Sequence, residues 1–331
     1  MVIVRRGERP SRYDADRSGE PSLYKILVMS EATPRFTPGT LWQSIIARSL
    51  SALECGALQP IATETQTLVD HGVHFDVHVV SSLTRKIADG LGHWQLPARH
   101  EQRANPFLPF ENDLFVADVS DSHLCLLNKY NVIDHHVLIV TRAFEPQENF
   151  LTDADFEALW SCMAEFDALG FYNSGRLAGA SQPHKHLQLV PLPLSPRTKD
   201  IPTSVLFGEP ADIGKPIRLR ELPFTHAFAW IDSVNTNART KQAADTFRLY
   251  RELLAASGID SAGPPTTPYN LLVTRRFLLL VPRRVERFEK VAVNALGFAG
   301  SFFVGRQESL ETIVRTGPMA LLREVSYNAP D

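Results

Sequence analysis

Three polar side chains occupy alternate positions in the segment HKHLQ: His184, His186 and Gln188. In a β-strand, residues two apart point to the same side, so this spacing predicts two imidazoles and one amide on one face. Leu187 and Leu189 would then pack into the core from the other face and hold the strand rigidly. Such a row suits metal binding, general base catalysis, or nucleophilic attack on phosphorus by a neutral imidazole.

Metal binding is the weakest of these three interpretations. Two histidines need a further hard ligand, glutamine is a poor one, and no carboxylate joins the row. We therefore predict no metal site. Lys185 lies between the two histidines and should point away from them, as a residue at the rim of the site.

The segment before the row, NSGRLAGASQP, is rich in residues with little side-chain bulk. Glycine, alanine and serine let the backbone approach a ligand closely, and the N–H groups of such a turn can bind phosphate oxygens. Neutral donors around a histidine suit a phosphate ester whose nucleophile must stay unprotonated. The residues of low bulk are Gly175, Gly179, Ala180 and Ser181, and the neutral donors are Asn173, Ser174, Ser181, Gln182 and Gln188.

The apolar periodicity predicts the elements that position this site. Helices are expected over 41–54, 152–169, 240–257 and in turns within 308–325. Strands are expected over 72–80, 123–128, 136–141, 184–190, 223–231 and in a hairpin over 268–284, with a loop and a strand over 294–305. Hairpin-like connections with few intervening helices indicate an α+β fold with an antiparallel sheet and flanking helices.

Composition limits the class of protein. The 331 residues carry a net charge of -3, so no basic excess points to nucleic acid. Three separated cysteines form no CxxC motif, and no signal peptide or membrane span is apparent, so we expect a cytoplasmic protein without a membrane partner. We expect residues 1–22 to be a mobile arm and 23–204 to carry the catalytic site. Residues 205–331 should form a C-terminal portion packed into the same globular unit.

The segment NSGRLAGASQPHKHLQLVP resembles the active-site segment of the diadenosine tetraphosphate (Ap4A) phosphorylases, also called ATP adenylyltransferases. This family belongs to the histidine-triad and galactose-1-phosphate uridylyltransferase superfamily. The segments GVHFDVHVVSSLTRK, NPFLPF, HLCLLNKYNVIDHHVLIVTRAFEPQ, PFTHAFAW and YNLLVTRRFLLLVPR resemble the same family, in the same order. The likeness spans roughly residues 40–325.

The resemblance implies a histidine-triad-like α+β fold with a C-terminal elaboration, and the reversible reaction of Ap4A with orthophosphate to ATP and ADP. His186 matches the nucleophile that forms an adenylyl-histidine intermediate. Gln188 matches the residue that contacts the transferred phosphoryl group, and His184 the residue that helps to orient its neighbour. We expect a backbone carbonyl near His184 to bond the second ring nitrogen of His186 and fix its tautomer.

The resemblance also implies further substrate contacts and partners. The matching positions are Lys86, Asn105, Pro106, Asn128, His136, Asn173, Gly179, Ala180, Ser181, Gln182, Thr274, Arg275 and Arg276. The ligands would be nucleotides (Ap4A, ATP, ADP and AMP) and orthophosphate, with no tightly bound cofactor. Mg²⁺ is a plausible companion of the polyphosphate. The alternatives are a nucleotidyltransferase acting on adenylyl sulfate or a sugar 1-phosphate, a dinucleoside polyphosphate hydrolase, and a non-catalytic nucleotide-binding module.

Overall fold

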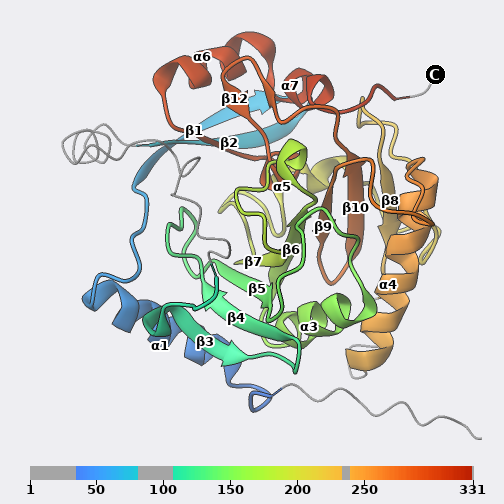
Figure 1. The fold of residues 1–331 in the computed structure, drawn as a ribbon. Helices are drawn as coiled ribbons and strands as arrows, with labels where there is room; N and C mark the ends of the chain where they lie inside the picture. Colours follow the sequence, from blue (N-terminus) through green and yellow to red (C-terminus); the bar gives the residue numbers. More distant parts are fainter. Residues whose placement is uncertain (1–34, 81–106, 233–238, 330–331) are drawn as a thin grey trace, which may run out of the picture. The chain divides into compact units, whose positions relative to one another are not determined.

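The computed structural model describes residues 35–80, 107–232 and 239–329 (Figure 1). Its helices are α1 (Leu41–Glu54), α3 (Asp153–Met163), α4 (Arg239–Ala256), α5 (Ala295–Ala299), α6 (Gln307–Thr316) and α7 (Pro318–Glu324). Short 3-10 turns are η1 (Asn112–Leu114), η2 (Arg176–Ala178) and η3 (Pro202–Leu206). The strands are β1 (Thr63–Asp70), β2 (Val73–Val80), β3 (Phe115–Asp118), β4 (His123–Leu127), β5 (Val137–Thr141), β6 (Ala168–Asn173), β7 (His186–Pro191), β8 (Ala227–Trp230), β9 (Tyr269–Val273), β10 (Phe277–Pro282), β11 (Arg287–Phe288), β12 (Val291–Ala292) and β13 (Ser301–Val304).

An eight-stranded sheet in the order β3-β4-β5-β7-β6-β9-β10-β8 forms the centre of the fold. All of its described pairings are antiparallel, as in the register Leu138↔Gln188 between β5 and β7. Strands from before and after residue 205 therefore lie in one sheet. The prediction of an α+β fold with an antiparallel sheet and flanking helices is confirmed.

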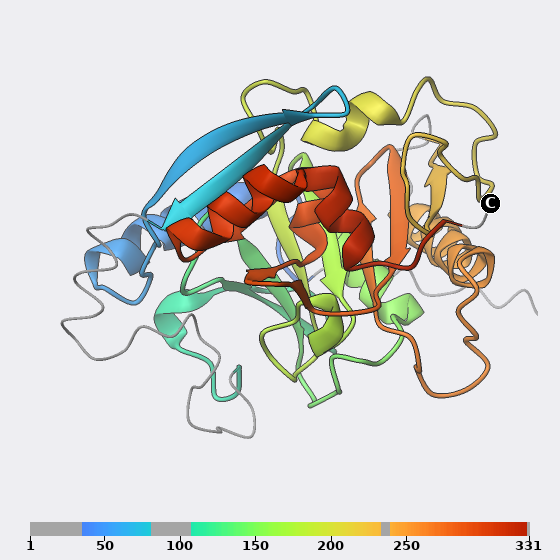
Figure 2. The ribbon, with the colours of Figure 1, turned by 90° about the horizontal axis from the view of Figure 1, so that it is seen from above.

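Each face of the central sheet is covered by a different set of elements. One core cluster joins α1, α3 and α4 to one face, through residues such as Ile45, Phe156 and Leu253. A second cluster joins the other face to β2, β13 and α5–α7, through residues such as Phe75 and Leu321. Figures 1 and 2 show the β1–β2 hairpin beside the C-terminal helices, on the side of the sheet opposite α3 and α4. Here β13 pairs with β2 in parallel and completes a small second sheet.

The expected elements agree with the structure in most places, and two of the differences have a clear physical reason. The helix expected over 152–169 ends at Met163, and its last residues belong to strand β6. Residues of β6 are buried on both faces, and a continuously apolar run of this kind does not distinguish a helix from a strand. The loop expected before β13 contains the short helix α5, which the Asn294 side chain caps by accepting from the N–H of Leu296.

Candidate nucleotide-transfer site

His186 opens strand β7 and is fixed by its own neighbours. Its ring nitrogen Nδ1 lies 2.7 Å from the backbone oxygen of His184, so Nδ1–H donates to that carbonyl. The predicted carbonyl partner is thereby confirmed. Burial lowers the pKa of His186 to about 4, more than the carbonyl contact raises it. The imidazole is therefore neutral at physiological pH, with the lone pair on Nε2.

The backbone of His186 is held by Gln147, a fully buried residue to which the sequence analysis gave no role. The Gln147 side chain accepts from the N–H of His186 at 2.8 Å and donates to its carbonyl at 3.2 Å. The same amide donates to the carbonyl of Asn173 at 2.9 Å. Gln147 thus ties the start of β7 to the end of β6. The sequence feature that could have identified Gln147 is its position at the end of RAFEPQ, a segment that resembles the family.

His184 contributes its carbonyl, while its ring lies elsewhere. This residue precedes β7 and forms an isolated bridge with Pro146. Its Nε2 lies 2.9 Å from the Thr141 hydroxyl and 3.1 Å from the Ala143 carbonyl. The prediction that His184 lines the same strand face is therefore only partly correct, because β7 begins two residues later.

Gln188 belongs to a chain of polar groups with His136 and Asn128. The Asn128 amide nitrogen lies 3.1 Å from His136 Nδ1, and His136 Nε2 lies 3.1 Å from Gln188 Oε1. Burial lowers the pKa of His136 to about 4, so this ring is neutral too. It accepts at Nδ1 and donates at Nε2. The Gln188 oxygen is thereby occupied, which leaves its amide N–H groups as donors toward a ligand.

A pocket lies beside this chain, on the face of β7 that carries His186 and Gln188. Its lining brings together the predicted positions Asn128, His136, Asn173, Gly179, Ser181 and Gln188. The remaining lining residues are Tyr130, Val132, Ile133, Asn294, Leu296 and Phe303. His186 itself is 4% exposed, and its ring centroid lies 5.2 Å from that of Phe107. It therefore lies next to the pocket rather than in its lining.

The small-residue segment forms the tight loop that its composition suggested. Gly175 and Gly179 adopt positive φ of 78° and 89°. A Cβ on Gly179 would lie 2.7 Å from the carbonyl oxygen of Val293, so only glycine fits this close contact. The expectation that the N–H groups of this segment bind phosphate needs correction at two positions. The N–H groups of Gly179 and Ala180 donate within the loop, to Arg176 and Gly175, because the turn itself uses them.

Several predicted contacts are not brought to this pocket. Thr274, Arg275 and Arg276 lie in the β9–β10 turn, beside the start of β6, whereas the pocket lies at its end. The Thr274 hydroxyl accepts from the N–H of Arg276, and Arg275 donates to the Met163 carbonyl. These three residues thus stabilise the far end of the sheet. Lys86, Asn105 and Pro106 lie outside the described residues, and Ala180 and Gln182 are not in the pocket lining.

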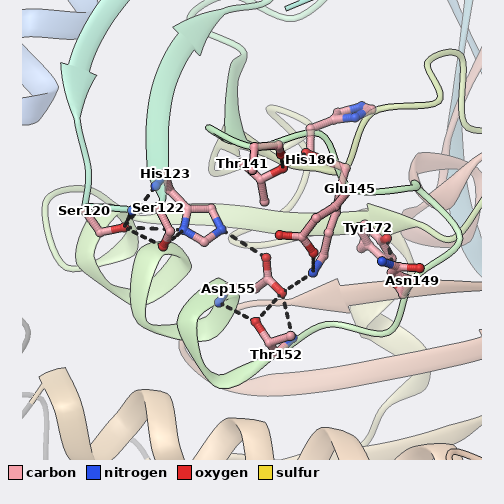
Figure 3. A network of polar contacts seen from close by, with 12 residues as sticks. Ser120, Ser122, His123, Thr141, Glu145, Asn149, Thr152, Asp155, Tyr172 and His186 are labelled. Carbon is pink, nitrogen blue, oxygen red and sulfur yellow. Dashed lines mark hydrogen bonds and ion pairs between the residues drawn. The ribbon is translucent and has the colours of Figure 1, made fainter. Parts of the chain in front are cut away.

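Lys185 corrects another expectation. It points away from the row, as predicted, but it is 1% exposed and not a rim residue. Its Nζ lies 2.6 Å from Asp155 and 3.1 Å from Glu145. Asp155, at the start of α3, also contacts His123 at 3.0 Å and accepts from the Thr152 hydroxyl at 2.8 Å. Figure 3 shows His123 and Thr152 beside Asp155, with the His186 ring pointing away from them.

The described residues contain no group of three or more His, Cys, Asp or Glu side chains that could hold a metal ion. None of the helices within the described ranges is long and apolar enough to cross a membrane. The described lining offers neutral groups: the His136 imidazole with His186 beside it, four amides (Asn128, Asn173, Gln188 and Asn294), the hydroxyls of Tyr130 and Ser181, and the loop backbone.

Comparison with known proteins places this geometry in a family. The model of the Ap4A phosphorylase N-terminal domain matches residues 31–209, and that of the ATP adenylyltransferase C-terminal domain matches residues 220–328. Diadenosine 5',5'''-P1,P4-tetraphosphate phosphorylase 2 of Saccharomyces cerevisiae is 25% identical over 235 residues, which cover 63% of this chain and 71% of the relative. Protein APA1 of the same yeast is 24% identical over 300 residues, covering 83% and 90% respectively.

A solved structure shares the fold. The crystal structure of yeast Ap4A phosphorylase Apa2 in complex with Ap4A superposes with a TM-score of 0.67 at 22% identity, covering 88% of this chain and 98% of that chain. The two matching models together span most of the sequence. The chain belongs to the Ap4A phosphorylase (ATP adenylyltransferase) family.

Proposed function

We propose that this chain phosphorolyses Ap4A with orthophosphate to ATP and ADP, reversibly, through an adenylyl group carried on His186. The proposal is supported by the family and by the names of its yeast relatives. The single observation that carries it is the state of His186. Its ring is neutral, and Nδ1–H is committed to the His184 carbonyl. Its Nε2 has no hydrogen-bond partner within the described residues.

The first displacement forms a bond between Nε2 of His186 and the phosphorus of the AMP moiety. The bond from that phosphorus to the bridging oxygen breaks, and ATP leaves with the electron pair. ATP is a weakly basic leaving group and needs little protonation, which fits a pocket lined by neutral donors. A neutral nucleophile also avoids the repulsion that an anionic nucleophile would meet at a polyphosphate.

The second displacement regenerates the imidazole. An oxygen of orthophosphate attacks the phosphorus of the adenylyl group, the P–N bond breaks, and ADP is released. Developing negative charge on the phosphoryl oxygens must be met by fixed donors. The Asn128–His136 chain occupies the Gln188 oxygen, so the amide N–H groups of Gln188 are the donors that face these phosphoryl oxygens.

The test is to incubate the protein with Ap4A, with and without orthophosphate, and to identify the products by mass. ATP and ADP formed only with orthophosphate support the proposal. Products formed equally well in water alone would identify a hydrolase. A second measurement follows exchange of labelled phosphate into ADP, which reports the second displacement alone. H186A should abolish both activities. A cytoplasmic location and the use of Mg²⁺ stay predictions from the sequence.

A further inference from the structure

Arg283, directly after strand β10, is a fully buried cation whose partners are all neutral. Within the described part of the chain it forms no ion pair. Its nitrogens donate instead to oxygens of Asn270 (2.6 Å), Val293 (2.8 Å), Val285 (2.9 Å), Glu286 (3.2 Å), Val325 (3.2 Å) and Ala178 (3.3 Å). All of these acceptors are backbone carbonyls except the Asn270 side-chain oxygen.

A charge in such a place is costly unless something compensates it, and a carboxylate is the usual solution. Glu286 is near, but its carboxylate lies 2.9 Å from Arg287 and 3.7 Å from Arg176. Burial lowers the pKa of Arg283 to about 9, and the guanidinium still carries its charge at neutral pH. The Glu286 carboxylate raises this pKa from a distance but forms no ion pair with Arg283, so the buried positive charge is solvated mainly by neutral oxygens.

The pocket beside Gln188 must bind an anionic ligand but lacks a positive charge of its own. None of its described lining residues is lysine or arginine, and its histidine is neutral. Only one layer of peptide groups separates this pocket from Arg283. The carbonyls of Ala178 and Val293 face the guanidinium, and the next residues, Gly179 and Asn294, line the pocket. In a trans peptide the N–H points opposite to the C=O, so the N–H of Asn294 is directed away from Arg283.

We propose that Arg283 supplies, from behind this layer, the positive charge that holds the anionic phosphates of the nucleotide in the pocket. It acts as a positioning residue through the 178–179 and 293–294 peptides and does not contact the ligand. The carbonyls that solvate the guanidinium orient these peptides, and the bound phosphate completes the charge balance. This inference rests on the proposed function, because it takes the pocket to be the nucleotide site.

A purely structural role for Arg283 makes a different prediction from an electrostatic one. A clamp that only shapes the loop would affect every ligand of the pocket by a similar factor. A buried charge affects ligands according to their own charge, since Coulomb energy scales with the product of the charges. Adenosine and AMP share the nucleoside and differ by the phosphate, so they separate the two roles.

The experiment measures the affinities of adenosine and AMP by calorimetry for the native chain, R283M, R283K and R284M. Arg284 is the matched control, because its exposed side chain donates to the Glu324 carbonyl and its loss changes the net charge equally. The native chain should prefer AMP. R283M should lose about tenfold or more of that preference, at an effective dielectric constant of about 20. R283K should keep most of the preference, and R284M should leave it unchanged.

Equal losses for both ligands in R283M, or no preference for AMP in the native chain, would overturn the inference. If R283M does not fold, R283Q takes its place. Glutamine removes the charge but keeps an amide that can donate to the same carbonyls, so the preference for AMP should fall as in R283M. Unchanged preference in R283Q would count against the inference. Phosphate exchange into ADP by the native chain tests the proposed function separately.

Discussion

The substitution Lys185→Met tests whether the charges beneath the histidine row hold the fold together. The Lys185 ammonium lies 2.6 Å from the Asp155 carboxylate, and both side chains are 1% exposed. Methionine fills similar space but leaves Asp155 with only His123 and Thr152 as partners. Breaking a buried ion pair by removing one partner costs about 3–5 kcal/mol. For a total stability of about 5–15 kcal/mol, that loss should be plain in an unfolding curve.

The loss should also depend on pH, with a sign that the structure fixes. Burial alone would raise the pKa of Asp155, but its contacts with His123, Lys185 and Thr152 outweigh burial and hold it at about 2. A depressed carboxyl pKa contributes stability that is present above the unfolded value of 3.8 and is lost as pH falls toward 2. In K185M the carboxyl pKa rises, so Asp155 takes up a proton more readily. The difference in stability between K185M and the native chain should therefore shrink from pH 7 toward pH 4.

The assay is urea unfolding at pH 7, followed by tryptophan fluorescence, for the native chain, K185M, D155N and the double variant. Because the two side chains interact directly, the double variant should be more stable than the sum of the single losses predicts. Lys241→Met is the matched control, since Lys241 lies 2.7 Å from Asp245 on the exposed face of α4. This pair is open to solvent, and its loss should change the stability little.

Two results would refute this reasoning. K185M could unfold at the same urea concentration as the Lys241 variant, which would show that burial adds nothing to the pair. The single losses could also add without coupling, which would show that Asp155 and Lys185 do not depend on each other. Either result would remove the ion pair as the support of the strand that carries His186.

The remaining predictions concern the site directly. G179A should destabilise the loop and weaken AMP binding at least about tenfold in calorimetry, because a Cβ would lie 2.7 Å from the Val293 carbonyl oxygen in a left-handed backbone. Q147L should lower kcat about tenfold or more in the phosphorolysis assay, because it frees the peptide of His186. KM should change less, because the Asn173 side chain in the pocket lining keeps its contacts with Asn270 and Ala295. His136 and His186 keep folded pKa values of about 4 against 6.5 in the unfolded chain, so they contribute stability above pH 6.5 that is lost as pH falls toward 4. Urea unfolding at pH 5 and pH 8 should show a loss of about 2 kcal/mol for each ring, and H136N should show a smaller pH dependence than the native chain.

The sequence predicted the site residues correctly where their spacing matches the two-residue period of a β-strand. The alternation of HKHLQ predicted that His186 and Gln188 share a face, and the need to fix a tautomer predicted the carbonyl partner near His184. It could not show where β7 begins, because that depends on pairing with β5 and β6. The side of Lys185 was predicted correctly, but its burial was not. Whether the far face of a strand meets solvent or a helix is decided by Asp155, thirty residues earlier in the chain.

The burial of Arg283 could not be predicted from the sequence, because it depends on contacts between distant segments of the chain. An arginine next to another arginine is expected on the surface by default, and the sequence gives no sign that one is buried. Its burial follows from partners such as Ala178, 105 residues away. The Gly-rich loop was recognisable from composition, but the use of its own N–H groups within the turn was not. Such internal bonds depend on φ values that residue type permits but does not dictate.

Burial creates both the reactivity of the site and its main electrostatic difficulty. The environment that keeps His186 and His136 unprotonated also disfavours an anionic ligand, because it offers little water and no cationic side chain in the described lining. A guanidinium behind a layer of peptides separates the two requirements. Its field crosses the layer while its hydrogen bonds end at carbonyls, so direct contacts with the phosphoryl oxygens are left to neutral donors such as Gln188.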